Sequence, residues 1–271
     1  SANVWGQSYL GLDGGFEGTA KIDNTTITSV GVSNSWSKNN SNTNISLENS
    51  IIRSGANSLR LNNTTTTGRR CFTPTFSPTS GQRLVIQYYR YVGDKTNTQE
   101  SHCDISRNGT ISSVAVQSST YTLPSTSGTW EKVEFAPTST DYVTTIFASI
   151  IHRQTGTGGN LFIDDLCIYT ATTFDNTAPG TPTSSSAGVA VNSLNISWSA
   201  PVTGVDGGGY LVVRGTVDPT TAPNVNGIYA VGNSIGTGTV VYQGTGSSFT
   251  DNGLTAGTNY YYRIYTYDKA Y

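Results

Sequence analysis

Short runs in which apolar and polar residues alternate recur along the chain, separated by turn residues. A period of two places successive side chains on opposite faces of a strand, so each run predicts a half-buried β-strand. The Gly, Pro, Asn and Ser residues between the runs predict tight turns. The runs lie at 57–61, 83–92, 129–135, 142–151, 160–169, 193–198, 210–214, 240–242 and 259–267. Many short strands at this spacing predict an all-β fold made of antiparallel sandwiches.

A break in this pattern at residues 174–188, FDNTAPGTPTSSSAG, divides the chain. Pro, Gly and Ser crowd this stretch and no apolar alternation survives in it, as is typical of interdomain linkers. We therefore predict a first sandwich over residues 1–173 and a second over residues 189–271. Residues 174–188 are predicted to be the linker and the start of the second domain.

The 271 residues carry little charge: 12% are Asp, Glu, Lys or Arg, and the net charge is −2. Nucleic-acid binding needs clustered Lys and Arg, and a membrane helix needs about 20 apolar residues in a row. The sequence has neither, and its β-branched and turn residues exclude a helical cytosolic enzyme. Low charge with abundant Thr, Ser and Asn favours a secreted or cell-surface protein. Because the sequence starts at Ser1 and contains no Met, we expect a processed segment of a longer precursor.

The chain has an odd number of cysteines, Cys71, Cys103 and Cys167. One disulfide, between Cys71 and Cys103, with one buried thiol is one interpretation, and three buried thiols is the other. No Cys or His spacing typical of a zinc site is present in the sequence.

Acidic residues lie at both ends of the first predicted sandwich. Glu17 stands in LDGGFEG, and Asp164 with Asp165 interrupts the apolar strand FIDDL. A buried carboxylate is costly unless it is paired or binds a metal, and several hard oxygen ligands suit Ca²⁺. Strand alternation predicts that Asp164 shares a face with Phe162 and Leu166 while Asp165 lies on the other face. Only one of the two acids should therefore enter a given site.

The motifs GGFEG, SGANSLRL, GTW followed by a strand, and FIDDL, in this order, resemble the galactose-binding-like jelly rolls. These folds include the carbohydrate-binding modules appended to secreted polysaccharide-degrading enzymes, and the resemblance covers about residues 8–170. It implies that Glu17, with Asp164 or Asp165, holds a structural calcium ion that clamps the first strand to the last. The alternative is that these acids are solvated at a sheet edge.

The resemblance also implies a sugar-binding surface, in which aromatic rings stack on sugars and amides or Arg contact their hydroxyls. In the strand 83–92, Leu84, Ile86 and Tyr88 are predicted to face the core. Gln87, Tyr89 and Tyr91 would then share the opposite face and form an aromatic-plus-amide platform. The alternative is that these are ordinary half-exposed strand tyrosines.

Other residues could extend this platform. We expect neighbouring strands to add Arg107 or His152, and a loop to add Trp36. His152 lies alone in an apolar strand, so it also fits a structural histidine. Trp130, in the GTW motif, is predicted to pack in the core.

The sequence offers no convincing catalytic site. A glycosidase needs two carboxylates about 5–10 Å apart across a cleft, but Glu131 and Glu134 are three apart on a strand and point to opposite faces. In the run His102, Cys103, Asp104, alternation separates the thiol from the other two side chains. We therefore predict that the segment is not an enzyme.

The second half of the chain resembles a fibronectin type III domain. Trp198 in SLNISW matches the core Trp of the second strand, and Leu254 and Tyr260 match the corner before the sixth strand, where the Leu packs inward and the Tyr bonds back to the backbone. Residues 217–238 depart from the pattern as a long Gly- and Asn-rich insertion, which is a surface loop or an added hairpin. No seventh strand follows, so we expect the natural polypeptide to continue past Tyr271.

Together these features predict a non-catalytic glycan-binding module and a spacer domain of a larger secreted or bacterial cell-surface protein. Its partner would be a polysaccharide or cell-surface glycan. One alternative is an adhesin stalk or filament segment that binds no sugar. Another is an accessory part of a polysaccharide-degrading enzyme whose catalytic domain lies outside this chain.

Overall fold

A computed structural model shows how these residues fold. It describes residues 16, 37–38, 45–62, 69–73, 83–93, 98–107, 115–119, 122, 124–136, 146–155, 159–171, 179–202, 208–225 and 227–267. All regular elements among these residues are β-strands, and they pair antiparallel, which confirms the predicted all-β class. The chain divides into two compact units, one made mainly of residues 8–174 and the other mainly of residues 175–270.

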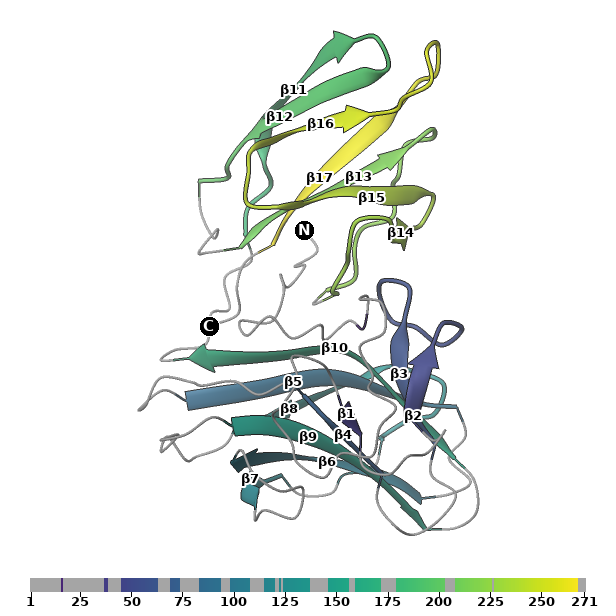
Figure 1. The fold of residues 1–271 in the computed structure, drawn as a ribbon, viewed down its shortest axis with the longest axis vertical. Coiled ribbons are helices and arrows are strands. Elements are labelled where there is room, and N and C mark those ends of the chain that lie inside the picture. Colours follow the sequence, from purple (N-terminus) through teal and green to yellow (C-terminus); the bar gives the residue numbers. More distant parts are fainter. Residues whose placement is uncertain are drawn as a thin grey trace. The chain divides into compact units, whose positions relative to one another are not determined.

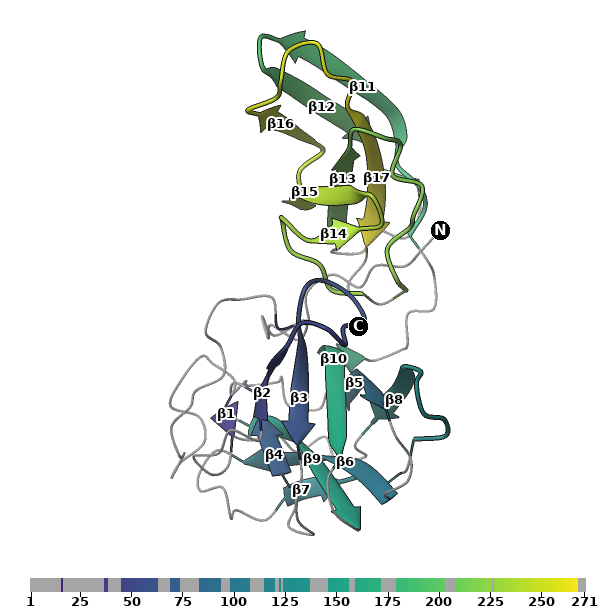
Figure 2. The same ribbon diagram turned by 90° about the vertical axis from the view of Figure 1, so that its right-hand side faces the viewer.

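The first unit is a jelly-roll sandwich of two five-stranded sheets (Figures 1 and 2). One sheet, here called the β5 sheet, has the order β2 (Ile45–Glu48), β3 (Ser58–Asn62), β10 (Asn160–Ala171), β5 (Arg83–Val92) and β8 (Glu131–Phe135). The other, the β9 sheet, has the order β1 (Ser37–Lys38), β4 (Arg69–Phe72), β9 (Ile146–Thr155), β6 (Thr98–Arg107) and β7 (Ala115–Ser118).

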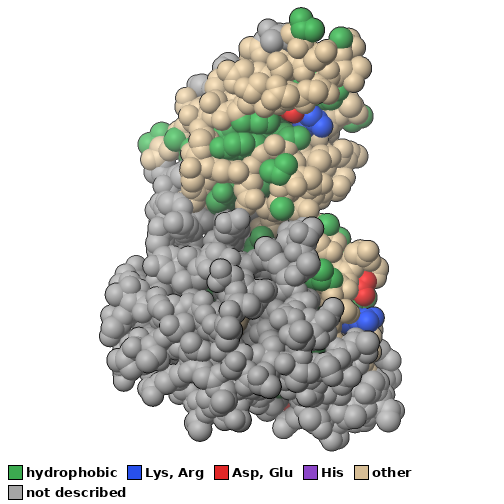
Figure 3. All heavy atoms as spheres, in the orientation of Figure 1, with side chains coloured by type: hydrophobic (Ala, Val, Ile, Leu, Met, Phe, Trp, Pro, Cys, Tyr) green, Lys and Arg blue, Asp and Glu red, His purple; other side chains and the backbone are tan. Residues whose placement is uncertain are grey.

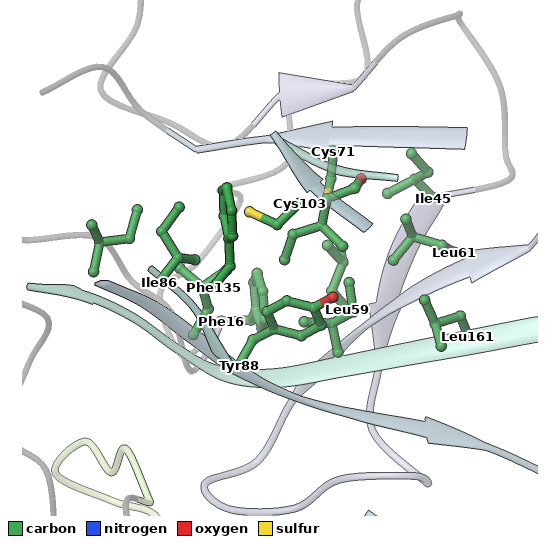
Figure 4. Close-up of a cluster of buried hydrophobic side chains, with 14 of the residues drawn as sticks. Phe16, Ile45, Leu59, Leu61, Cys71, Ile86, Tyr88, Cys103, Phe135 and Leu161 are labelled. Atoms are coloured by element: carbon green, nitrogen blue, oxygen red, sulfur yellow. The ribbon is translucent and has the colours of Figure 1, made fainter. Parts of the chain in front are cut away.

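Alternate side chains of both sheets close on each other to form one apolar core. Leu84, Ile86 and Tyr88 of β5 belong to it, which confirms the predicted inward face of that strand. Figure 4 shows Tyr88 and Phe135 of the β5 sheet near Phe16, in the same cluster of buried side chains as Cys103 of the β9 sheet. The outer face of β5 is therefore the one that carries Gln87, Tyr89 and Tyr91.

A β-bulge in β10 changes the alternation predicted for the acidic strand. Asp164 pairs with Tyr89 and Cys167 with Gln87, so two residues of β10 oppose one of β5. Asp165 occupies the bulge with a φ of 50°, a left-handed conformation that Asp tolerates better than most residues. Leu161 and Ile163 before the bulge, and Leu166 and Ile168 after it, all face the core. The prediction that Phe162, Asp164, Leu166 and Ile168 share a face is wrong, because the bulge shifts the phase of the strand.

The core also contains a buried polar network centred on Arg90. The Arg90 guanidinium donates from Nη1 to Ser101 Oγ at 2.9 Å and to the Thr122 carbonyl at 2.8 Å. Its Nε and Nη2 donate to Glu131 Oε2 at 3.1 and 3.0 Å. The Tyr88 hydroxyl lies 3.2 Å from Ser101 Oγ. This network joins β5, β6 and β8 and gives the buried cation several partners.

The second unit is a smaller sandwich of a three-stranded and a four-stranded sheet. The first sheet has the order β11 (Thr183–Ala190), β12 (Ser193–Ser199) and β16 (Ser248–Asn252). The second has the order β14 (Ser234–Ile235), β15 (Gly238–Gly244), β13 (Gly209–Gly215) and β17 (Tyr261–Tyr267). The start of β11 falls within residues 174–188, and β14 is the added hairpin strand of the 217–238 insertion. Charged side chains are sparse on the visible surface of the described residues (Figure 3).

The residues singled out in the second half take the predicted positions. Trp198 is buried and packs edge-on against Tyr210 with ring centroids 5.2 Å apart. Leu254 is buried, and the Thr255 backbone N–H donates to the Tyr260 hydroxyl oxygen at 3.1 Å. The inward Leu and the backbone-bonded Tyr of the predicted corner are thus both present.

The three cysteines are free and buried, which confirms the interpretation of three buried thiols and contradicts that of a Cys71–Cys103 disulfide. Both residues pair with Ile150, on opposite sides of β9. Strands lie about 4.8 Å apart, so their Cα atoms are separated by about 10 Å, and a disulfide needs about 7 Å or less.

Burial should keep these thiols unreactive, since it raises the pKa of Cys71 and Cys167 to about 12. We expect Ellman's reagent to detect no thiol in the native protein and all three in denaturant. A count of one thiol in denaturant without reductant would show that a disulfide forms after all.

Among the described residues there is no helix of sufficient length and apolarity to cross a bilayer.

Candidate functional site

The outer face of the β5 sheet carries the predicted platform, but its three members differ in exposure. Gln87 and Tyr89 are only 3% and 9% exposed, whereas Tyr91 is half-buried. Burial raises the pKa of the Tyr89 hydroxyl. Of the predicted platform, only Tyr91 is accessible enough to meet a ligand without rearrangement.

Arg53, from the segment between β2 and β3, occupies the space over Tyr89. Its guanidinium carbon lies 3.4 Å from the centroid of the Tyr89 ring, a cation–π contact. The same guanidinium forms an ion pair with Asp165, and the Arg53 backbone N–H donates to Asp164 Oδ2 at 2.8 Å. Asp164 Oδ1 also accepts the backbone N–H of Asp165 at 2.8 Å. Arg53 thus joins both acids, contrary to the prediction that they act on separate faces.

The predicted calcium site is only partly within view. Glu17 lies outside the described residues, and Asp164 and Asp165 have the protein partners given above. Among the described residues, no three His, Cys, Asp or Glu side chains gather closely enough to hold a metal ion. Calcium binding by Glu17 with one of the two aspartates stays a prediction.

An aromatic cluster lies at the end of β5 on this face. The Tyr91 ring lies 5.4 Å from that of Trp130 and 5.9 Å from that of Phe162, centroid to centroid. Tyr91 and Trp130 are half-buried, and Phe162 is covered. The prediction that Trp130 packs in the core is wrong. Trp130 continues the outer face of β8, whose Val133 and Phe135 point inward.

Two polar groups lie beside this cluster on the same face. Lys132 of β8 is directly opposite Tyr89, and its Nζ lies 3.5 Å from Glu134 Oε2. Both side chains are exposed at the sheet surface. Glu131, in contrast, turns inward to Arg90, so the predicted separation of Glu131 and Glu134 is confirmed.

Arg107 and His152 do not extend the platform, because β6 and β9 belong to the other sheet. His152 faces the interior, where its Nδ1 lies 3.0 Å from the Leu61 carbonyl oxygen, and burial lowers its pKa to about 4. It is the structural histidine considered above. The side chain of Arg107, and Trp36 as a whole, lie outside the described residues.

The outer face of the β9 sheet presents a second polar row along β6. His102 Nε2 lies 3.2 Å from Asp104 Oδ1, and both side chains are buried. Cys103 between them points into the core, which confirms the predicted separation of the thiol. Because an imidazole and a carboxylate can both hydrogen-bond to polar groups, this row is the competing candidate surface.

No family model matches the chain, and no curated protein matches it. Among solved structures, it is similar to a β-1,2-glucanase from Parabacteroides distasonis, with 15% identity and a TM-score of 0.48 over 83% of this chain and 32% of that one. It is similar to the carbohydrate-binding module TmCBM61 in complex with β-1,4-galactotriose, with 11% identity and a TM-score of 0.39 over 50% and 88% of the two chains. It is also similar to the CBM22-1 xylan-binding domain from Paenibacillus barcinonensis, with 11% identity and a TM-score of 0.40 over 53% and 90%. This chain spans about a third of the glucanase chain.

Proposed function

We propose that the first unit is a non-catalytic glycan-binding module and that Tyr91 and Trp130 form its stacking surface. The observation that carries this proposal is a pair of half-buried aromatic rings, 5.4 Å apart, on the outer face of the β5 sheet. The C–H groups on one face of a sugar ring are weakly positive, and the face of an aromatic ring is negative, so the two attract.

The packing beneath this pair favours binding, because it fixes the rings before a ligand arrives. Tyr91 leans edge-on against the covered ring of Phe162, so its orientation is set by the sheet. A ring held in place loses little conformational entropy on binding. Lys132 and Glu134, exposed on the same face, supply a donor and an acceptor for sugar hydroxyls.

For the second unit we propose a fibronectin type III-like spacer. The sheet orders, the buried Trp198 and the Tyr260 corner support this role. Both units would belong to a larger secreted or bacterial cell-surface protein, and other domains of that polypeptide would be their neighbours. The alternative is an adhesin segment that binds no sugar. The following experiment distinguishes the two, because only our proposal predicts glycan binding.

The Tyr91→Ala variant should lose glycan binding. Removing a stacked ring costs about 1–2 kcal/mol, so we expect affinity to fall about five- to thirtyfold, while Tyr91→Phe keeps most of it. Affinity electrophoresis and calorimetry against a panel of plant, algal and host polysaccharides would measure this. Tyr261→Ala removes an exposed tyrosine of the second unit and is the matched control.

Two results would contradict the proposal. One is that no polysaccharide of the panel binds the wild-type chain. The other is that Tyr91→Ala and Trp130→Ala, both with circular dichroism spectra like the wild type, bind as tightly as it does.

A further inference from the structure

The aromatic pair is part of a strip that crosses the β5 sheet at one level. Phe162 of β10 pairs with Tyr91 of β5 on one side and with Arg60 of β3 on the other. Trp130 lies beside Tyr91 and forms the end of the strip opposite Arg60. The strip therefore consists of Trp130, Tyr91, Phe162 and Arg60, in this order. Strands lie about 4.8 Å apart, so the strip is about 14 Å long and perpendicular to the strands.

Arg60 gives this strip a cation at one end. The side chain is half-buried, and its Nε is enclosed yet makes no hydrogen bond to the described part of the chain. Among the described acids, Glu48 feels the charge of Arg60, and its Oε1 accepts the backbone N–H of Ser50 at 2.8 Å and that of Asn49 at 3.1 Å. Hydrogen bonds from Ser50 are the main cause that lowers the pKa of Glu48, and the charge of Arg60 contributes a smaller part. Glu48 is thus held mainly by its own turn.

We propose that the strip binds a polysaccharide that carries carboxylate groups, with the sugar chain running across the strands. This inference rests on the glycan-binding function proposed above and adds the ligand's charge and direction. Sugar rings stack along Trp130 and Tyr91, and the sugar chain continues across β10, where the Phe162 ring is covered, to bring a uronate carboxylate to Arg60. The planar guanidinium suits a carboxylate because it can donate two parallel N–H···O bonds. A strip about 14 Å long accepts several sugar rings rather than a single one.

Paired probes test the charge directly. The wild-type chain is titrated with uronate polysaccharides, such as polygalacturonate and alginate, and with the methyl ester of each, which has the same backbone without the charge. We expect at least one acidic form to bind about fivefold or more tightly than its ester, and the difference to shrink as salt screens the charges.

The Arg60→Gln variant assigns that preference to Arg60. We expect it to bind the acidic and esterified forms about equally, with the ester bound as in the wild type. Arg263→Gln removes an exposed arginine of the second unit, which pairs with Asp218, and should leave the preference unchanged.

The outcomes separate the two proposals. Equal binding of acids and esters by the wild type, or a preference that survives in Arg60→Gln, overturns the inference about carboxylates and leaves the stacking surface standing. Preference for sulfated galactans over every uronate also overturns it. Binding to no glycan, or binding that Tyr91→Ala does not weaken, overturns the proposed function itself.

Discussion

Acidification is expected to destabilise the first unit by about 2 kcal/mol between pH 7 and pH 5, and by about 3 kcal/mol at the limit, through His152 alone. Burial lowers the pKa of this histidine to about 4 in the folded state, whereas an unfolded histidine titrates near 6.5. Well above pH 6.5 the side chain is neutral in both states and has no effect. As the pH falls, the unfolded state takes up the proton first, so stability is lost until the folded pKa is passed.

Urea unfolding at several pH values measures this effect, and His152→Asn isolates it. The Asn amide can still donate to the Leu61 carbonyl that Nδ1 of His152 now contacts, but it does not titrate. We expect the variant to be less stable at pH 7, because the smaller side chain leaves a cavity, and to lose less stability on acidification. Identical pH dependence in both proteins would show that His152 is not the buried neutral group described here.

Replacing Arg90 with Leu is expected to cost about 3 kcal/mol of unfolding free energy. The change removes a cation that satisfies Ser101, the Thr122 carbonyl and Glu131 at once. Glu131 would keep its charge in a partly buried position without this partner, and that uncompensated charge is the main cost. The value is at the lower end for a broken buried pair because the Glu131 side chain keeps 28% of its surface in solvent.

Chemical denaturation of three variants tests this explanation. Arg90→Leu combined with Glu131→Leu should recover part of the loss, since neither charge is then left alone. Lys132→Leu breaks an exposed ion pair of the same strand and should change stability by less than about 1 kcal/mol. An Arg90→Leu protein within about 0.5 kcal/mol of the wild type would mean that the network contributes little.

The sequence predicts the strands whose two faces differ most clearly. The inward phase of β5 carries Leu84, Ile86, Tyr88 and Val92, with Arg90 as its one polar member, and both the bounds of the strand and the inward face of Leu84, Ile86 and Tyr88 are as predicted. The polar strand β6, TQESHCDISR, was not among the predicted runs. Its inward face is formed by Ser101, Cys103 and Ile105, which are too small or too polar to stand out.

Other features depend on contacts that local patterns do not contain. Which strands neighbour β5 is decided by pairing between distant segments, so residues of β6 and β9 could not be assigned to a sheet from sequence. The bulge could not be predicted, because its left-handed position is occupied by Asp165 and not by a glycine. Arg53 reaches Tyr89 and Asp165 from a segment more than a hundred residues away from the latter. For the site, the alternation of β5 was enough to find Tyr91. The alternation of the run 129–135 likewise groups Trp130 with Lys132 and Glu134, so the outward position of Trp130 was also within reach of the sequence.

The most direct test of this account is a crystal structure of the chain bound to a polysaccharide fragment selected by the panel. Our account predicts a sugar ring lying over Tyr91 and Trp130, with the chain of sugars crossing β5 toward β10. A fragment bound against the His102–Asp104 row of the β9 sheet, with Tyr91 and Trp130 untouched, would contradict it.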